Sequence, residues 1–141
     1  MGSIKINVPP FAKVTSKSVK VSVSPRGCSW AGTQLGNYAK KQGVYIFHQN
    51  GKPLYVGKTN GRSMSFGMRL RRHLQESAAG SKHTYPKLAA LSQPFFASFI
   101  PTEVVRRRVQ CQDYKLSDQS KVNIFEQALQ GAYKPSFQDG T

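Results

Sequence analysis

Arg69 and His73 stand one helical turn apart, and their types and spacing could do chemistry. They follow Ser65, a suitable N-cap for a helix, and Arg72 comes three positions after Arg69. Cations that share a helical face repel each other slightly, so this cluster makes more sense with an anion in front of it. A phosphate group is the anion that we expect.

Glu126 is a carboxylate beside a predicted buried stripe on a helix. The chain has only 6 acidic residues, and none of the neighbours of Glu126 on its own helix is basic. A carboxylate at the edge of a core requires a cation, and a bound metal ion would supply one. A helix cap or an ion pair to an arginine elsewhere is the alternative. The predicted stripe consists of Val122, Phe125, Leu129 and Ala132.

The element that must position this chemistry is a predicted β-hairpin. Apolar and polar residues alternate on both sides of Asn50–Gly51, which is a strong hairpin signal because both residues tolerate a positive φ. We expect its strands over about residues 43–48 and 54–58. Side chains alternate between the two faces of a strand, so Tyr45 and Tyr55 should point away from the Val, Ile and Leu residues beside them.

Hydrophobic periodicity predicts the remaining elements. Phe66, Leu70 and Leu74 have the spacing of a buried helical stripe. Gly131 is the expected end of the last helix. Residues 104–108 receive no assignment. The other expected strands are residues 18–23 and 95–100, and the other expected helices are residues 29–41, 85–91 and about 117–131.

The chain is strongly basic for its length. It has 141 residues, enough for one domain, with 21 Lys+Arg against 6 Asp+Glu and a net charge of +15. Such a surplus indicates a polyanionic partner, nucleic acid first and an anionic membrane second. A membrane is disfavoured because the chain has no run of about 18 apolar residues and no basic helix with a broad apolar face. The arginines at 106–108 are either phosphate contacts or a solvated charge run.

The cysteines and the N-terminus indicate a cytoplasmic protein. Cys28 and Cys111 are far apart, and no Cys-x-x-Cys motif or histidine pair accompanies them. A structural zinc site and a disulfide framework are therefore not predicted, and we expect reduced thiols. The first residues lack the apolar core of a signal peptide.

The order of these residues resembles the GIY-YIG nuclease domain. Gly43–Tyr45 is followed after a short turn by Tyr55–Gly57, then by Arg69 and His73, and finally by Glu126 on a predicted helix. No single one of these features is specific. Their order and spacing together carry the resemblance.

The resemblance covers about residues 43–138. Lys58, directly after the second motif glycine, resembles family members with a lysine there. Val44 replaces the isoleucine of the first motif, and Gln138 stands where asparagine is typical. The loop between the second motif and Arg69 is longer than in compact members.

The resemblance implies an α+β fold with a small three-stranded antiparallel sheet flanked by helices. It implies a nuclease domain over residues 43–141, and residues 1–42 then form a basic N-terminal extension that contacts DNA. The implied function is a metal-dependent DNA endonuclease that hydrolyses phosphodiester bonds with Mg²⁺ or Mn²⁺. A stand-alone, restriction-like enzyme that cuts duplex DNA at specific sites is the preferred form, and cleavage of both strands would need a homodimer on the duplex.

The resemblance also assigns roles to residues. Glu126 binds the metal, and Arg69 donates to the non-bridging phosphate oxygens. Tyr45 activates the water, with His73 taking or relaying the proton. A free tyrosine has a pKa of about 10, so Lys58, Arg69 and the metal are needed to favour its phenolate. The full expected catalytic set is Tyr45, Tyr55, Lys58, Arg69, His73 and Glu126. The expected DNA contacts are Arg62, Arg71, Arg72, Arg106, Arg107, Arg108, Lys40 and Lys41.

Other functions stay open at this point. The chain could be an inactive nucleic-acid binder of the same fold, a structure-specific repair or recombination nuclease, or an unrelated RNA-associated protein. A binder has no use for Glu126, whereas an RNA-associated protein needs exposed aromatics such as Phe95, Phe96 and Phe99. The sequence does not decide which tyrosine is the base, which DNA is recognised, or what Gln138 and His83 do.

Overall fold

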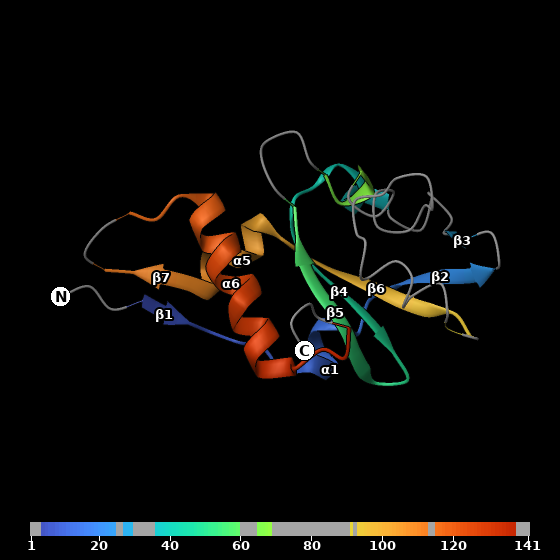
Figure 1. Ribbon diagram of the computed structural model, residues 1–141. Helices are drawn as coiled ribbons and strands as arrows, with labels where there is room; N and C mark the ends of the chain where they lie inside the picture. Colours follow the sequence, from blue (N-terminus) through green and yellow to red (C-terminus); the bar gives the residue numbers. More distant parts are fainter. Residues whose placement is uncertain are drawn as a thin grey trace.

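The fold is α+β and contains two antiparallel sheets (Figure 1). The larger sheet has the strand order β3-β2-β6-β4-β5, and the smaller one pairs β1 with β7. The computed structural model describes residues 4–24, 27–29, 36–59, 65–68, 91, 93–112 and 115–137.

The strands are β1 (Ile4–Ile6), β2 (Val19–Ser24), β3 (Gly27–Ser29), β4 (Gly43–Gln49), β5 (Lys52–Lys58), β6 (Phe95–Pro101) and β7 (Val109–Cys111). The helices are α1 (Phe11–Val14), the 3-10 helix η1 (Gly36–Lys40), α5 (Thr102–Arg108) and α6 (Asp118–Tyr133).

The β4–β5 hairpin forms as predicted. Asn50 and Gly51 have φ values of 52° and 75°, the positive values that a tight hairpin turn requires. Gly43 begins β4 with a φ of 149°, and a Cβ there would overlap the carbonyl oxygen of Ile100 on β6. The first motif glycine is therefore required by both its conformation and the closeness of β6.

The expected three-stranded sheet is present but is part of a larger one. Strands β6, β4 and β5 are adjacent and antiparallel, and β2 and β3 extend them to five strands. The pairing of β2 with β6 joins Val19 to Ala97 and Val21 to Phe95. The expectation of three strands is wrong because residues 4–29, which belong to the expected N-terminal extension, supply strands to both sheets.

Two hydrophobic clusters cover the two faces of the hairpin. Tyr45 and Tyr55 belong to one cluster, whereas Val44, Ile46 and Val56 belong to the other, which contacts α6. The predicted alternation is thus confirmed for these five residues. Leu54 is an exception, because it joins the cluster of Tyr55 near the register shift after Phe47.

Helix α6 begins as predicted and ends later than predicted. The Ser117 hydroxyl caps it by accepting a hydrogen bond from the backbone N–H of Ser120 (3.1 Å). The helix passes through Gly131 and ends at Tyr133, whose ring packs on Phe11 (5.3 Å between ring centroids). This tertiary contact carries the helix past the glycine. Of the predicted stripe, Val122, Phe125 and Leu129 are buried and Ala132 is exposed.

The other predicted elements have mixed outcomes. Strands at 18–23 and 95–100 are confirmed as β2 and β6. The helix expected over 29–41 is wrong at its start, because Ser29 ends a strand, and of the residues described in this range Gly36–Lys40 are helical, in the 3-10 form. The helix expected at 85–91 falls outside the described residues except for Leu91, which is not helical.

Figure 1 shows how the two sheets and the helices lie relative to one another. Helices α5 and α6 separate the β1–β7 ribbon from the five-stranded sheet, and α6 packs on β5 and β4. Cys111 on β7 has a free thiol. Among the helices in the described part of the chain, none is both long and apolar enough to cross a membrane.

Candidate active site

Tyr45 and Tyr55 lie on the same face of the hairpin. Tyr45 is opposite Gly57 in the strand register and Tyr55 is opposite Phe47, so the two tyrosines are diagonal neighbours. Their ring centroids are 6.2 Å apart. The exposed fraction is 1% for Tyr45 and 9% for Tyr55, so Tyr55 is the more accessible of the two.

Gly57 provides the room for the Tyr45 phenol. A Cβ at position 57 would overlap the hydroxyl and the ring of Tyr45 and would lie 2.7 Å from the Tyr55 ring. Each of these contacts is too close for real atoms. The second motif glycine is therefore required by side-chain packing across the hairpin, and it places the two tyrosines together above the β5 backbone.

Lys58 and Glu126 meet on the opposite face of β5. The Lys58 ammonium nitrogen lies 3.7 Å from the nearer carboxylate oxygen of Glu126. Their side chains are 23% and 13% exposed, so the pair is partly screened from water. Lys58 is thus one ion-pair partner of Glu126, and an additional ion pair to an arginine stays a prediction.

Helix α6 is held against β5 close to this pair. Gln130, one turn after Glu126, donates from its side-chain amide to the backbone carbonyl of Val56 (3.1 Å). Strand β5 is at the edge of the sheet in the described part of the chain. Groups on both of its faces are therefore separated by a single strand, with the tyrosines on one side and the Lys58–Glu126 pair on the other.

Thr59 ties the two motif strands together at their shared end. Its hydroxyl oxygen accepts a hydrogen bond from the backbone N–H of Gly43 (3.0 Å). Its own backbone N–H donates to the carbonyl of Gly43 (3.0 Å). Sequence reasoning did not select Thr59 or Gln130, because neither stands at a recognisable spacing from another polar residue.

A polar hollow adjoins this end of the hairpin. It has a volume of about 440 Å³, and its lining includes Lys40, Thr59, Ser65 and Val122, the last one turn before Glu126. Ser65 accepts a hydrogen bond from the backbone N–H of Met68 (3.4 Å), as expected of an N-cap, and residues 66–68 are helical. Lys41, Arg106, Glu103 and Asp118 line the same hollow, so its lining carries charges of both signs.

Two of the expected DNA contacts have acidic partners. The Arg106 guanidinium binds both carboxylate oxygens of Asp118 (2.9 and 2.7 Å), and the pKa of Asp118 is lowered, first by this hydrogen bond. Lys41 pairs with Glu103, whose pKa the Lys41 hydrogen bond also lowers. These ion pairs would have to open before either cation could bind phosphate.

Some predicted residues lie outside the described residues. They are Arg62, Arg69, Arg71, Arg72, His73, His83 and Gln138. The structure brings together Tyr45 with Tyr55 and Lys58 with Glu126, and it places Arg107 and Arg108 at a separate hollow beside β1.

A metal ion at this site would have one carboxylate ligand from the described residues. No group of three His, Cys, Asp or Glu side chains gathers within that part of the chain. A single carboxylate fits Mg²⁺, which keeps several waters and takes further oxygens from a substrate phosphate. Glu126 is the residue that would hold it.

His48 is a buried titratable residue that the sequence pattern did not reveal. Its Nε2 is 2.9 Å from the Ser98 hydroxyl, which donates to the carbonyl of Lys17 (3.0 Å). Burial lowers the pKa of His48 from 6.5 to about 4, so the ring is neutral at pH 7. It ties β4 to β6, away from the candidate site.

No family model matches this chain. The comparisons with curated proteins and with solved structures also give no match.

Proposed function

We propose that this protein is a metal-dependent DNA endonuclease of the GIY-YIG type. The observation that carries the proposal is the hairpin, in which the Tyr45 phenol fills the space left by Gly57 with Tyr55 beside it. Close packing thus explains why both motif positions, Gly43 and Gly57, are occupied by glycine. The adjacent strands β6, β4 and β5, with α6 on one face, agree with the three-stranded core implied by the resemblance.

The proposed chemistry is hydrolysis of a phosphodiester bond by an activated water. Tyr45 accepts the proton of that water, and Tyr55 orients it from the adjacent position. Arg69 donates to the non-bridging oxygens of the phosphate, and His73 takes or relays the proton. Glu126 would hold one Mg²⁺ or Mn²⁺ ion, which supplies Lewis-acid polarisation of the phosphate.

Lys58 has two roles in this proposal. Its positive charge balances Glu126 before the metal binds, at the recorded separation of 3.7 Å. It also favours the phenolate forms of the tyrosines on β5 and β4 through its charge. The net charge of +15 supports DNA as the substrate, because phosphate neutralisation dominates binding to nucleic acid.

Two observations favour a second candidate, a binder of nucleic acid without catalytic activity. Tyr45 is only 1% exposed, although the proposed base must reach a water molecule. In addition, the Lys58 ammonium lies within ion-pair distance of Glu126, where the metal would have to bind. A protein that only binds DNA would tolerate both features.

Plasmid cleavage by the purified protein with Mg²⁺ or Mn²⁺ tests the proposal. Glu126→Gln should abolish cleavage and leave DNA binding intact, whereas Gln127→Ala, at an exposed position on the same helix, should change neither. Discrete fragments would indicate a site-specific enzyme, and a smear would indicate a nonspecific or structure-directed one. Tight binding without any cleavage would favour the binder, and cleavage by Glu126→Gln would refute the metal assignment.

A further inference from the structure

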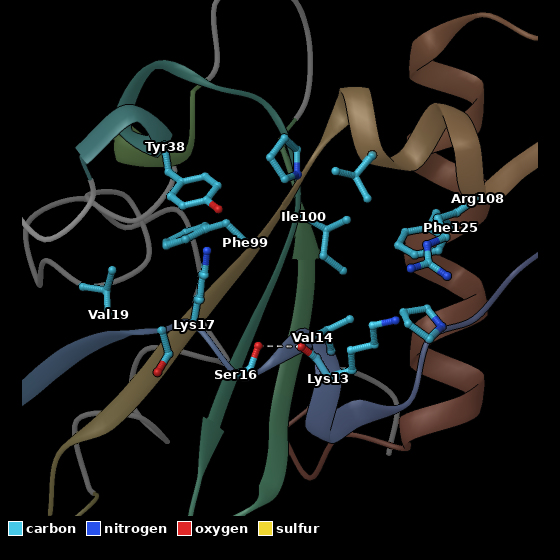
Figure 2. A pocket seen from close by; sticks show the side chains of 14 residues that line it. Lys13, Val14, Ser16, Lys17, Val19, Tyr38, Phe99, Ile100, Arg108 and Phe125 are labelled. Atoms are coloured by element: carbon cyan, nitrogen blue, oxygen red, sulfur yellow. Dashed lines mark hydrogen bonds between the residues drawn. The ribbon is translucent and has the colours of Figure 1, made fainter.

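A cavity lies between α1, β6 and α6, apart from the candidate active site. Its volume is about 460 Å³, within the usual range for small-ligand sites. Figure 2 shows its lining, with Tyr38 next to Phe99 on one side and Phe125 on the other. No residue of the expected catalytic set lines it.

The cavity exists because β2 leaves β6 part-way along the sheet. The ladder between the two strands joins Val19 to Ala97, and no later β6 residue pairs with β2. The chain before β2 turns away into α1, where Ser16 donates to the carbonyl of Lys13 (2.9 Å). The β6 residues after the ladder, from Phe99 to Pro101, therefore form a wall of the cavity.

Three cations line this cavity, and none of the described residues that line it is acidic. They are Lys13, Lys17 and Arg108, with Lys17 on the Phe99 side and Lys13 and Arg108 on the α6 side (Figure 2). The acidic residues of the described part of the chain form ion pairs with other cations. Those pairs are Glu103 with Lys41, Asp118 with Arg106, and Glu126 with Lys58.

Lys13 and Arg108 share one side of the cavity with no acid in its described lining, so their charges repel each other, and a bound anion removes that repulsion. The rest of the lining defines the anion further. Val14, Ile100 and Phe125 give an apolar surface, whereas the Ser16 and Tyr38 hydroxyls can hydrogen-bond to a polar edge. A flat group with apolar faces and a polar edge suits this surface better than an alkyl chain does.

We propose that this cavity binds one nucleoside phosphate, with the phosphate at Lys13 and Arg108 on the α6 side and the base against Tyr38 and Phe99 on the other side, beside Lys17. Either a free nucleotide or an unpaired nucleotide within a strand presents this chemistry. The inference goes beyond the proposed hydrolysis, because it needs neither Glu126 nor a metal ion. The sequence predicts a phosphate contact at Arg108, and the cavity adds Lys13 beside it.

The test is equilibrium binding by the intact protein in EDTA, so that cleavage plays no part. The probes are a labelled single-stranded oligonucleotide and labelled AMP, with inorganic phosphate as a competitor. Lys13→Gln combined with Arg108→Gln should weaken binding about ten-fold or more and lower the salt slope by about 0.7 for each lost phosphate contact. Lys52→Gln combined with Lys115→Gln removes the same charge at exposed positions outside the cavity and should weaken binding less.

The two sources of the ligand give different results. Binding of AMP that the cavity variant loses identifies a free nucleotide, and loss of strand binding without AMP binding identifies a nucleotide within a strand. Equal weakening by the cavity and control variants would overturn the proposal. Displacement of AMP by inorganic phosphate at the same concentration would also overturn it, because the base would then make no contact.

Photocrosslinking of the unaltered protein provides a measurement that does not depend on the folding of a variant. An oligonucleotide that carries 5-iodouridine should crosslink to Tyr38 or Phe99, the aromatic residues at one side of the cavity. Mass spectrometry of the digested complex locates the crosslink. If AMP does not bind, crosslinks found only outside the cavity would overturn the proposal.

Discussion

Gly57 lies opposite Tyr45 in the β4–β5 hairpin, and the Tyr45 phenol occupies the space that a Cβ at position 57 would need. The cross-strand neighbour Tyr45 therefore excludes any residue with a Cβ at position 57. In the proposed nuclease, this contact sets the position of the proposed base relative to β5.

Gly57→Ala should damage both stability and cleavage. The added methyl group would collide with the Tyr45 hydroxyl and the Tyr55 ring, and such overpacking costs about 1–3 kcal/mol. A displacement of a catalytic group by about 1 Å can lower a rate about 100-fold. Urea denaturation and plasmid cleavage measure the two effects.

Gly131→Ala is the matched control for this change. Position 131 is helical and exposed, and a Cβ there has no heavy atom within 4 Å. Alanine should raise the free energy of unfolding by up to about 1 kcal/mol and leave cleavage unchanged. If Gly57→Ala were as stable as the unaltered protein in the same assays, the predicted collision would be relieved at no cost in free energy, and the expected destabilisation would be wrong.

Lys58→Gln should make the proposed metal bind more tightly. Lys58 and Mg²⁺ compete for the carboxylate of Glu126, because the ammonium nitrogen already lies 3.7 Å from it. We expect the Mg²⁺ concentration at half-maximal cleavage to fall several-fold, while the maximal rate falls about 10-fold because a positive charge near the phosphate is lost. A Mg²⁺ titration of the cleavage rate separates these effects.

Lys52→Gln removes a lysine from the same strand at its exposed end and serves as the control. It should leave the Mg²⁺ dependence unchanged. A higher Mg²⁺ requirement in Lys58→Gln would contradict competition and would mean that Lys58 helps to hold the metal-bound substrate.

The features that could be predicted from the sequence depend on local signals. The Asn50–Gly51 turn, the Ser117 cap and the alternation around Tyr45 each concern residues close together in the chain. The structure confirms all three. Lys58, in contrast, pairs with Glu126 from another element and could not be selected from helical spacing.

The features that could not be predicted depend on contacts between distant residues. The sheet grows to five strands because Val19 pairs with Ala97, and a strand pattern alone does not identify its partner. The packing reason for Gly57 also needs the register that sets it opposite Tyr45. In the same way, the cavity beside β6 follows from where β2 leaves the sheet.

His48 should make the protein less stable in mild acid. Burial lowers its pKa from 6.5 to about 4, so between these values the unfolded chain binds a proton that the folded protein does not. Stability is therefore full above about pH 6.5 and falls, as the pH drops to about 4, by up to about 3 kcal/mol from this residue. Urea denaturation at several pH values measures the slope.

His48→Gln should flatten that slope, since glutamine can keep a hydrogen bond to Ser98 and does not titrate. Glu103 and Asp118 have lowered pKa values, and their contributions are lost only in stronger acid, equally in both proteins. An identical pH dependence of the two proteins between about pH 7 and pH 4.5 would mean that His48 is protonated at no cost in the folded state.

Lys134→Gly should stabilise the C-terminal end of α6. Lys134 adopts a left-handed conformation (φ 51°) and its backbone N–H donates to the carbonyl of Gln130 (3.0 Å). A left-handed conformation costs about 1–2 kcal/mol for a residue with a Cβ, and glycine avoids this cost but loses more entropy on folding. We expect a net gain of about 0.5–1 kcal/mol, measured by thermal unfolding.

Lys134→Ala separates the causes, because it removes the charge and keeps the Cβ. It should give no gain, whereas an equal gain in both variants would attribute the effect to the lost charge.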